Sequence, residues 1–248
     1  MINPMELTGK HILVTGASSG IGRETAILCS QLGATVSIVA RRETQLQETM
    51  HMMEGTSHKI YIQDLSDLTG IEELVKRATA DSGVLDGIVH CAGIGQNRSL
   101  SLTKPEFIQE TLAVTFYSFA ELIRIASKKK YSKDGSSFVG ISSVASIRGD
   151  KAQGAYAAAK AAMNGLIHPY AKELGGRKIR LNTVAFGMIR TEMYQSFQLS
   201  GGTEGVLQGQ YLGIGEPRDA ANVIAFLLSD ASRFITGTTL IADGGYLS

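Results

Sequence analysis

Tryptophan is absent from this 248-residue chain, and cysteine, proline and excess charge of either sign are scarce. The two cysteines, Cys29 and Cys91, cannot form a disulfide framework or, by themselves, a zinc site, and they fit a reducing compartment. The 24 Lys and Arg residues are balanced by 23 Asp and Glu residues, which leaves a net charge of +1. This balance argues against a nucleic-acid or anionic-membrane partner, because both require a basic excess.

Long hydrophobic runs are missing as well. No apolar run reaches the roughly 18 residues that span a bilayer, and residues 1–10 lack the basic stretch and apolar core of a signal peptide. We therefore expect a soluble, cytoplasmic protein. The five histidines show no metal-ligand spacing, so no metal is expected.

Short β-branched runs alternate with segments of helical periodicity, a pattern typical of βα units in a parallel sheet. The predicted strands are 11–15, 34–40, 59–63, 85–91, 136–142, 179–185 and 238–242. The predicted helices are 21–32, 43–54, 68–80, 103–130, 153–174 and 217–229. We expect one α/β domain over residues 1–248, a doubly wound parallel sheet of about seven strands with helices on both faces. The irregular stretch at about 190–215 is predicted to form a substrate lid.

A glycine-rich segment, Thr15 to Gly22, follows the first predicted strand and begins the first helix. Glycines at this place let a dinucleotide pyrophosphate approach the backbone, and the helix N–H groups face its phosphates. The spacing is G-x-x-x-G-x-G rather than G-x-G-x-x-G, so a simple tight turn is the alternative.

Two arginines, Arg41 and Arg42, follow the second strand, where an NAD site usually places an acid for the ribose hydroxyls. Guanidinium groups can bind a 2′-phosphate, so the pair favours NADP(H). A solvated basic start to a helix is the alternative. Asp64, after the third strand, is expected either to cap the adenine or to cap the next helix.

Tyr156 and Lys160 are four residues apart on a predicted helix and therefore share one face. A neighbouring ammonium favours the phenolate and so brings a tyrosine pKa toward values useful for proton transfer. Ser143 ends the fifth strand, at the sheet edge where ligands of doubly wound folds bind, and its hydroxyl can bind a carbonyl oxygen. A packed ring, a solvated amine and a strand-end cap are the separate alternatives for these three residues.

These features resemble the short-chain dehydrogenase/reductase family over nearly the whole chain. The other matching segments, in the same order, are Cys91 to Gly93, Ile179 to Asn182, Gly187 to Thr191, Ile235 to Gly237 and Asp243 to Gly245. The resemblance implies a Rossmann-like fold and hydride transfer between a nicotinamide and a carbonyl carbon. It further implies that Tyr156 is the acid/base, that Lys160 holds the ribose and lowers the tyrosine pKa, and that Ser143 orients the substrate oxygen.

The resemblance also implies a set of cofactor-binding residues in the glycine loop, at the strand ends and after the sixth strand. They are Gly16, Ser18, Ser19, Gly20, Ile21, Gly22, Arg41, Arg42, Asp64, Leu65, Cys91, Ala92, Gly93, Tyr156, Lys160, Gly187, Ile189 and Thr191. The substrate is expected to meet Ser143 and, beneath the lid, Met193, Tyr194 and Tyr211. A homotetramer is implied by analogy, with residues 157–162 and the long helix 103–130 at a dimer contact.

Three positions depart from the family pattern. Cys91 replaces an asparagine that ties neighbouring strands together, which predicts a local stability cost. Thr115 replaces the asparagine that often completes a catalytic tetrad, and its shorter side chain offers no amide carbonyl, which predicts slower turnover. Phe186 replaces a proline, which alters the wall near the nicotinamide.

Within the family, the chain is most similar to the 3-oxoacyl-acyl-carrier-protein reductases, through the loop after Thr15, the Tyr156 to Lys160 motif and Gly215 to Asp219. The predicted activity is NADPH-dependent reduction of a ketone such as a 3-oxoacyl thioester, presented as a small molecule or on acyl carrier protein. The alternatives are another ketone, polyol, sugar or steroid as substrate, or a non-catalytic NADP(H)-binding regulator. Arg177 and Lys128 to Lys133 fall near the carrier-binding regions of those reductases, but basic helix ends that complement their own dipoles are the favoured interpretation.

Overall fold

The computed structural model describes residues 3–199 and 209–248. Within them, seven strands form one parallel sheet in the order β3-β2-β1-β4-β5-β6-β7. The strands are β1 (His11–Thr15), β2 (Thr35–Ala40), β3 (Lys59–Ile62), β4 (Leu85–His90), β5 (Ser132–Ser143), β6 (Arg180–Phe186) and β7 (Thr239–Ala242). The chain reverses its direction of winding between β1 and β4, so the carboxyl ends of these two strands flank a crevice. The predicted doubly wound sheet is confirmed.

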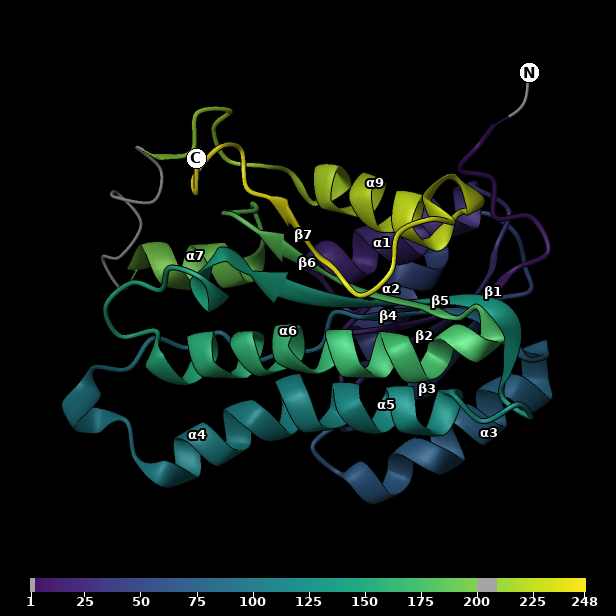
Figure 1. The fold of residues 1–248 in the computed structure, drawn as a ribbon, viewed down its shortest axis with the longest axis horizontal. Helices are drawn as coiled ribbons and strands as arrows, with labels where there is room; N and C mark the ends of the chain where they lie inside the picture. The colour runs from purple at the N-terminus through teal and green to yellow at the C-terminus, as the bar shows by residue number, and fades with distance from the viewer. Residues whose placement is uncertain (1–2, 200–208) are drawn as a thin grey trace.

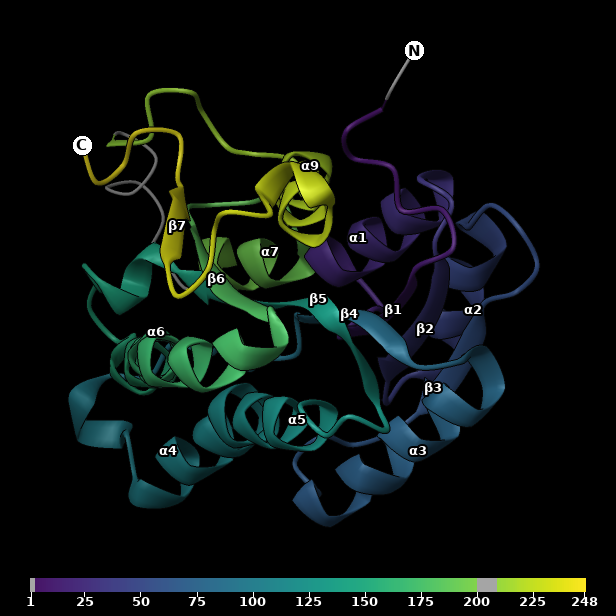
Figure 2. The ribbon, with the colours of Figure 1, turned by 45° about the vertical axis from the view of Figure 1, so that its right-hand side comes forward.

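Helices cover both faces of this sheet (Figures 1 and 2). One face carries α1 (Gly20–Gln31), α2 (Glu43–Met52) and α9 (Pro217–Leu228). The other face carries α3 (Ile71–Ser82), α4 (Pro105–Leu112), α5 (Ser118–Ala126) and α6 (Gly154–Leu174). Helix α7 (Glu192–Leu199) lies beyond the carboxyl ends of β5 and β6, on the left in Figure 1.

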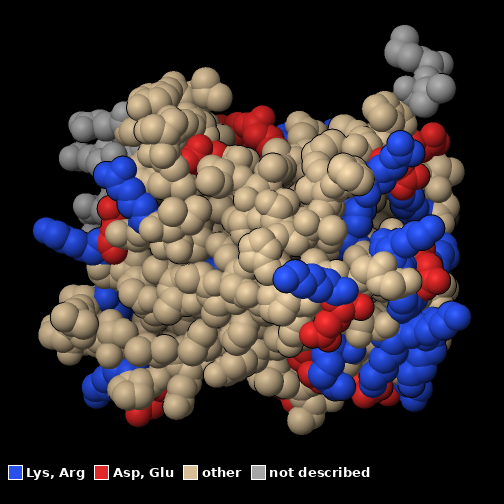
Figure 3. Space-filling model, in the orientation of Figure 1, with Lys and Arg blue, Asp and Glu red and all other residues tan. Residues whose placement is uncertain are grey.

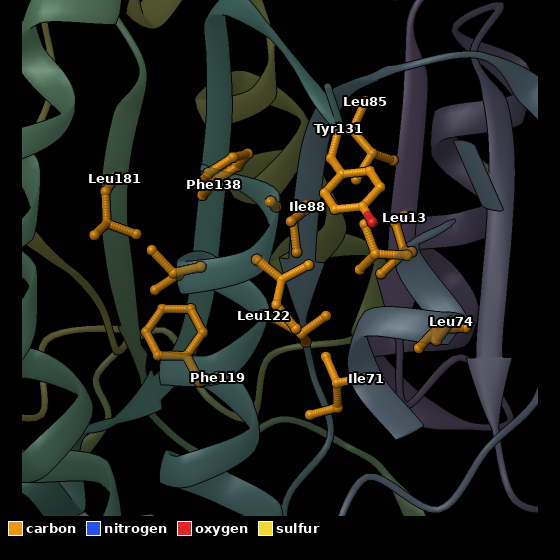
Figure 4. Packing of buried hydrophobic residues seen from close by; sticks show 14 of the residues in the cluster. Leu13, Ile71, Leu74, Leu85, Ile88, Phe119, Leu122, Tyr131, Phe138 and Leu181 are labelled. Carbon is orange, nitrogen blue, oxygen red and sulfur yellow. The ribbon is translucent and has the colours of Figure 1, made fainter. Parts of the chain in front are cut away.

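The strands are apolar on both sides because both faces are covered. Along β1, Leu13 packs in the cluster beneath α3 and α5, whereas its neighbours Ile12 and Val14 pack in the cluster beneath α1 and α9. Figure 4 shows the first cluster, in which Phe119 and Leu122 of α5 meet strand residues such as Ile88. The two cores hold the strand ends in fixed register, and the site is built at those ends.

The predicted long helix 103–130 differs from the structure at its start and in its middle. It begins at Pro105, because the Thr103 hydroxyl donates to the carbonyls of Arg98 and Ser99 instead of capping the helix. A π-helical turn at Ala113–Tyr117 then separates α4 from α5. Such turns widen the helix locally and are frequent at functional sites.

The two ends of the predicted lid segment lie side by side. The Gly215 N–H donates to the Met188 carbonyl, and the Arg190 N–H donates to the Gly215 carbonyl. The segment that contains α7 therefore begins and ends at neighbouring positions beyond the carboxyl end of β6. Residues 200–208 of the predicted lid lie outside the described residues, and the role of this segment as a lid stays a prediction.

Candidate active site

A cavity of about 460 Å³ opens at the carboxyl ends of β1, β4, β5 and β6. Every residue predicted to bind the cofactor, from Gly16 to Thr191, lies in its wall, as do Ser143, Met193 and Tyr194. The fold thus brings together residues that are up to about 175 positions apart in the sequence.

The glycine loop forms one end of this cavity, and two of its glycines have no room for a side chain. Gly16 has a φ of 67°, and a Cβ there would lie 2.8 Å from the backbone nitrogen of Ala92. A Cβ at Gly22 would collide with the carbonyl of Gly16. Ser19 is the N-cap of α1, but its side chain makes no capping bond, so the first N–H groups of the helix are left for a ligand. A close backbone with exposed donors fits a pyrophosphate.

Arg42 reaches back from the end of β2 over this loop. Its guanidinium donates to the hydroxyls of Ser18 at 3.1 Å and Ser19 at 2.9 Å. It also pairs with the carboxylate of Glu192, the first residue of α7, at 3.3 Å. Arg41 lies beside it, 3.8 Å from Asp64. Both predicted phosphate-binding arginines therefore line the cavity next to the glycine loop.

Asp64 does not cap the next helix, whose N-cap is Asp67. The Asp64 carboxylate accepts hydrogen bonds from the backbone N–H and the hydroxyl of Ser66, and these bonds, with Arg41 nearby, lower its pKa. The side chain thus caps the turn that follows β3. Asp64 and Leu65 also line the cavity, and contact with an adenine stays a prediction.

Ser143, Tyr156 and Lys160 converge at the other end of the cavity. Ser143 ends β5, and its hydroxyl accepts the N–H of Ala145, while Tyr156 on α6 lines the same cavity close to this hydroxyl. The Lys160 ammonium lies 5.7 Å from the centre of the Tyr156 ring and donates to the carbonyl of Ile141. Two hydroxyls therefore face one point of the cavity, with a buried cation behind them.

Burial dominates the protonation of this group. It raises the pKa of Tyr156, an effect that the nearby hydroxyl of Ser143 partly offsets. Burial also lowers the pKa of Lys160, to about 8. The Lys160 ammonium donates to the Ile141 carbonyl and is not among the causes that shift the pKa of Tyr156, so a lowering of the tyrosine pKa by Lys160 stays a prediction. A phenol of raised pKa stays protonated at neutral pH, as a proton donor must.

Thr115 does not line the cavity. It is fully buried in the π-helical turn, and its hydroxyl accepts the N–H of Ile94 at 3.4 Å. A Cβ at Gly93 would lie 3.3 Å from this hydroxyl and 3.4 Å from the Lys160 ammonium, so both groups flank the Gly93 turn. Thr115 is thus placed to support the turn from behind rather than to touch a substrate.

Cys91 lines the cavity at the end of β4. Burial raises the pKa of its thiol to about 12, so the thiol is neutral at physiological pH and packs as a small apolar group. Among the described residues, the Cys91 side chain makes no hydrogen bond that could take the place of those expected from an asparagine.

A buried histidine supports the same turn. One ring nitrogen of His90 lies 3.0 Å from the hydroxyl of Thr15 and the other lies 3.3 Å from that of Ser118, while the Ala92 N–H donates to Thr15. This network joins β1, β4 and α5 directly beneath the cavity. The sequence marked His90 only as an isolated histidine, because its two partners lie 75 and 28 positions away.

We expect His90 to make the fold sensitive to acid. Burial lowers its pKa to about 3, so the unfolded chain binds more protons than the folded chain between that value and about 6.5. Stability therefore falls as the pH drops below about 6.5. Between pH 7 and pH 5, the difference in unfolding free energy between the wild type and His90→Gln should shrink by about 2 kcal/mol, measured by urea denaturation. The exposed His51→Gln is the control, and a difference independent of pH would contradict the expectation.

Aromatic and sulphur-containing side chains of α7 cover the tyrosine. The Phe197 ring lies edge-on to the Tyr156 ring at 6.5 Å, and the sulphur of Met193 packs closely on Gly95. Tyr194 is buried in the cavity wall, and its hydroxyl accepts a hydrogen bond from Gln198. Met193 and Tyr194 thus both line the cavity, and their contact with a substrate stays a prediction.

Tyr211 is the predicted substrate residue that the structure places away from the cavity. This side chain is 73% exposed and does not line the cavity. Its ring occupies the space above Gly245, a residue with a φ of 94°, so it packs on the C-terminal turn instead.

The sequence missed several residues of the substrate end. Most of them come from the segment that joins β5 to α6 or from the C-terminal turn: Val144, Ala145, Arg148, Asp150, Gln153 and Tyr246. For the first five of them, the only signal available was their position between Ser143 and Tyr156, whereas Tyr246 lies far from both in the sequence. Val144 and Ala145 add buried apolar wall to this end of the cavity, and Arg148 and Asp150 add exposed charged groups.

Among residues 3–199 and 209–248, no helix is long and apolar enough to cross a membrane. In the same residues, no three His, Cys, Asp or Glu side chains are grouped so that they could hold a metal ion.

Comparison with known proteins agrees with this geometry. A family model described as enoyl-(acyl carrier protein) reductase matches residues 16–247. The chain belongs to the short-chain dehydrogenase/reductase family. It is 35% identical to the 3-oxoacyl-acyl-carrier-protein reductase FabG of Thermotoga maritima, over 97% of this chain and 99% of the relative. It is 34% identical to the FabG of Escherichia coli, over 97% and 98% of the two chains.

Solved structures of the family share the fold. A short-chain dehydrogenase/reductase from Serratia marcescens matches with a TM-score of 0.89 and 26% identity, covering 99% of this chain and all of that one. A 3-oxoacyl (acyl-carrier-protein) reductase from Agrobacterium tumefaciens, solved with NADP bound, matches with a TM-score of 0.85 and 29% identity, covering 98% and 96%. The chain is therefore an oxidoreductase of this family that binds a nicotinamide cofactor.

Proposed function

We propose that the chain is an NADPH-dependent reductase of 3-oxoacyl thioesters. The observation that carries the proposal is the convergence of Ser143, Tyr156 and Lys160 at one end of a cavity whose other end is the glycine loop beneath Arg42. The chain is similar to the FabG proteins, whose name describes them as 3-oxoacyl-acyl-carrier-protein reductases, and this similarity supports the substrate class.

The proposed roles follow from where the hydroxyls lie. When bound, the nicotinamide cofactor supplies the hydride that the carbonyl carbon accepts. The Ser143 hydroxyl donates a hydrogen bond that holds the carbonyl oxygen, and the Tyr156 phenol donates the proton that this oxygen takes up. The phenolate left behind is stabilised by Ser143 and by the positive charge of Lys160. Phe197 excludes water from the ring of Tyr156.

Fluorescence titration with NADPH and NADH tests the cofactor, and a substrate panel in the same cuvette tests the reaction. We expect tight NADPH binding and NADPH oxidation that depends on acetoacetyl thioesters. Oxidation only with crotonyl thioesters would support an enoyl reductase, as the matching family model is described. Turnover only with simple ketones, sugars or steroids would reassign the substrate, and binding without turnover across the panel would favour a regulator.

Arg42 is expected to select the phosphorylated cofactor. In Arg42→Gln the charge-assisted hydrogen bonds to the 2′-phosphate are lost, so the dissociation constant for NADPH should rise about ten-fold while that for NADH changes by less than about two-fold. The exposed Lys76→Gln, which breaks a surface pair with Glu73, is the matched control. Equal weakening of both cofactors would show that Arg42 only holds the loop through Ser18 and Ser19.

The basic residues near the predicted carrier-binding regions are already bound within the chain. Arg177 pairs with Asp134 at 2.7 Å and donates to two backbone carbonyls, and Lys128 pairs with Glu72 at 2.7 Å. Arg177 thus ties the end of α6 to β5 and to the end of α5, and Lys128 ties the end of α5 to α3, so both stabilise contacts between elements rather than their own helix ends. Acyl carrier protein as the form in which the substrate arrives, and a cytoplasmic location, stay predictions.

The homotetramer also stays a prediction. The face drawn in Figure 3, across which α6 runs, carries few charges in its middle, whereas charged side chains gather at its right-hand edge. Ala158 and Ala161 are exposed on α6, within the predicted dimer contact. Light scattering coupled to size exclusion tests the expected mass of four chains.

A further inference from the structure

Arg42 has a carboxylate partner that the proposed cofactor site does not need. The guanidinium is held over the glycine loop by the hydroxyls of Ser18 and Ser19, and Glu192 approaches it from α7 at 3.3 Å. The two side chains are separated by 150 positions in the sequence, so only the fold brings them together.

The pair is solvent-exposed, so breaking it costs little free energy. The Arg42 side chain is 43% exposed and that of Glu192 is 61% exposed. Exposed ion pairs stabilise a fold by at most about 1 kcal/mol. Glu192 can leave Arg42 while α7 stays in place, because Met193 and Phe197 hold the helix on Gly95 and Tyr156.

We propose that Glu192 competes with the 2′-phosphate of the cofactor for Arg42 and thereby limits the preference of the site for NADPH over NADH. This inference rests on the proposed function, in which Arg42 binds that phosphate. A phosphate monoester carries a charge of about −1.5 to −2 near pH 7, so a carboxylate at the same guanidinium repels it and occupies its donor. The uncharged ribose hydroxyls of NADH meet neither obstacle.

The test is a titration of the wild type and Glu192→Gln with NADPH and with NADH at low ionic strength. The amide keeps the size of the side chain and removes its charge. In Glu192→Gln we expect the dissociation constant for NADPH to fall about three- to ten-fold, while that for NADH changes by less than about two-fold. Added salt should shrink the gain, because screening weakens both the ion pair and the repulsion.

The matched control is Glu43→Gln. Glu43 follows Arg42 directly and is exposed, but its carboxylate accepts a hydrogen bond from Gln47 instead of meeting the arginine. It removes the same charge near the site without freeing Arg42, so its effect on NADPH should stay below about two-fold.

The outcomes separate the inference from the proposed function. A wild type that prefers NADH would overturn the proposed cofactor and, with it, the premise of the inference. A wild type that prefers NADPH, combined with an unchanged ratio of the two dissociation constants in Glu192→Gln, would overturn the inference alone. An equal gain in Glu43→Gln would also overturn it, since a general charge effect would then suffice.

Discussion

Replacing Tyr156 with phenylalanine is expected to lower kcat by about a thousand-fold while the dissociation constant for NADPH changes by less than about two-fold. The phenol lines the cavity close to Ser143, and its raised pKa keeps it protonated at neutral pH. Phenylalanine keeps the ring that packs against Phe197 and removes only the hydroxyl. The measurement is steady-state NADPH oxidation with an acetoacetyl thioester, together with a cofactor titration.

Tyr194→Phe is the matched control for this experiment. Tyr194 lines the same cavity, and its hydroxyl bonds with Gln198 rather than with Ser143. We expect its kcat to stay within about three-fold of the wild type, because no proton transfer is assigned to it. If Tyr156→Phe kept the wild-type rate, the role of Tyr156 as proton donor would be wrong. If the wild type bound NADPH and turned over nothing, the regulatory alternative would be favoured.

Periodicity in the sequence predicted the layers of the fold because every buried strand is a short apolar run between helical segments. It could not predict pairings that depend on distant partners. The predicted fifth strand starts at residue 136, whereas β5 starts at Ser132, because Ser132 pairs with Leu85 across an irregularity in the register. Lys133 and Asp134 are polar and look like a loop, and they lie in the irregular stretch between Ser132 and Ser137, which pair with Leu85 and Gly87. The π-helical turn likewise leaves no periodic signal.

Motifs in the sequence predicted the cofactor end of the site better than the substrate end. Gly16 and Lys160 belong to motifs whose spacing follows from backbone geometry, and the structure places both in the cavity wall. Gln153 and Arg148 also line the cavity but belong to no such pattern. Tyr211 was assigned because it lies within the predicted lid segment of the sequence. In the structure its ring packs on Gly245 in the C-terminal turn instead. The ion pair of Arg42 and Glu192 depends on how α7 sits on the sheet, which no local pattern encodes.

Replacing Gly22 with alanine is expected to weaken NADPH binding about a hundred-fold and to lower the unfolding free energy by about 1–3 kcal/mol. A Cβ at this position would collide with the carbonyl of Gly16, which is backbone and cannot rotate away. The start of α1 must therefore move away from the loop, and its N–H groups then no longer point at the phosphates. Both quantities can be measured on one preparation, by fluorescence titration and by urea denaturation.

Gly175→Ala is the control for this substitution. Gly175 has a φ of −57°, and a Cβ there would meet no atom within 4 Å among the described residues, so alanine should be tolerated and cofactor binding left unchanged. Weak NADPH binding in Gly22→Ala with a wild-type unfolding free energy would still support a pyrophosphate site at the glycine loop, because the loop can shift without unfolding the sheet. Wild-type affinity for NADPH in Gly22→Ala would show that the first turn of α1 does not hold the phosphates, and the assignment of this end of the cavity to the pyrophosphate would then be wrong.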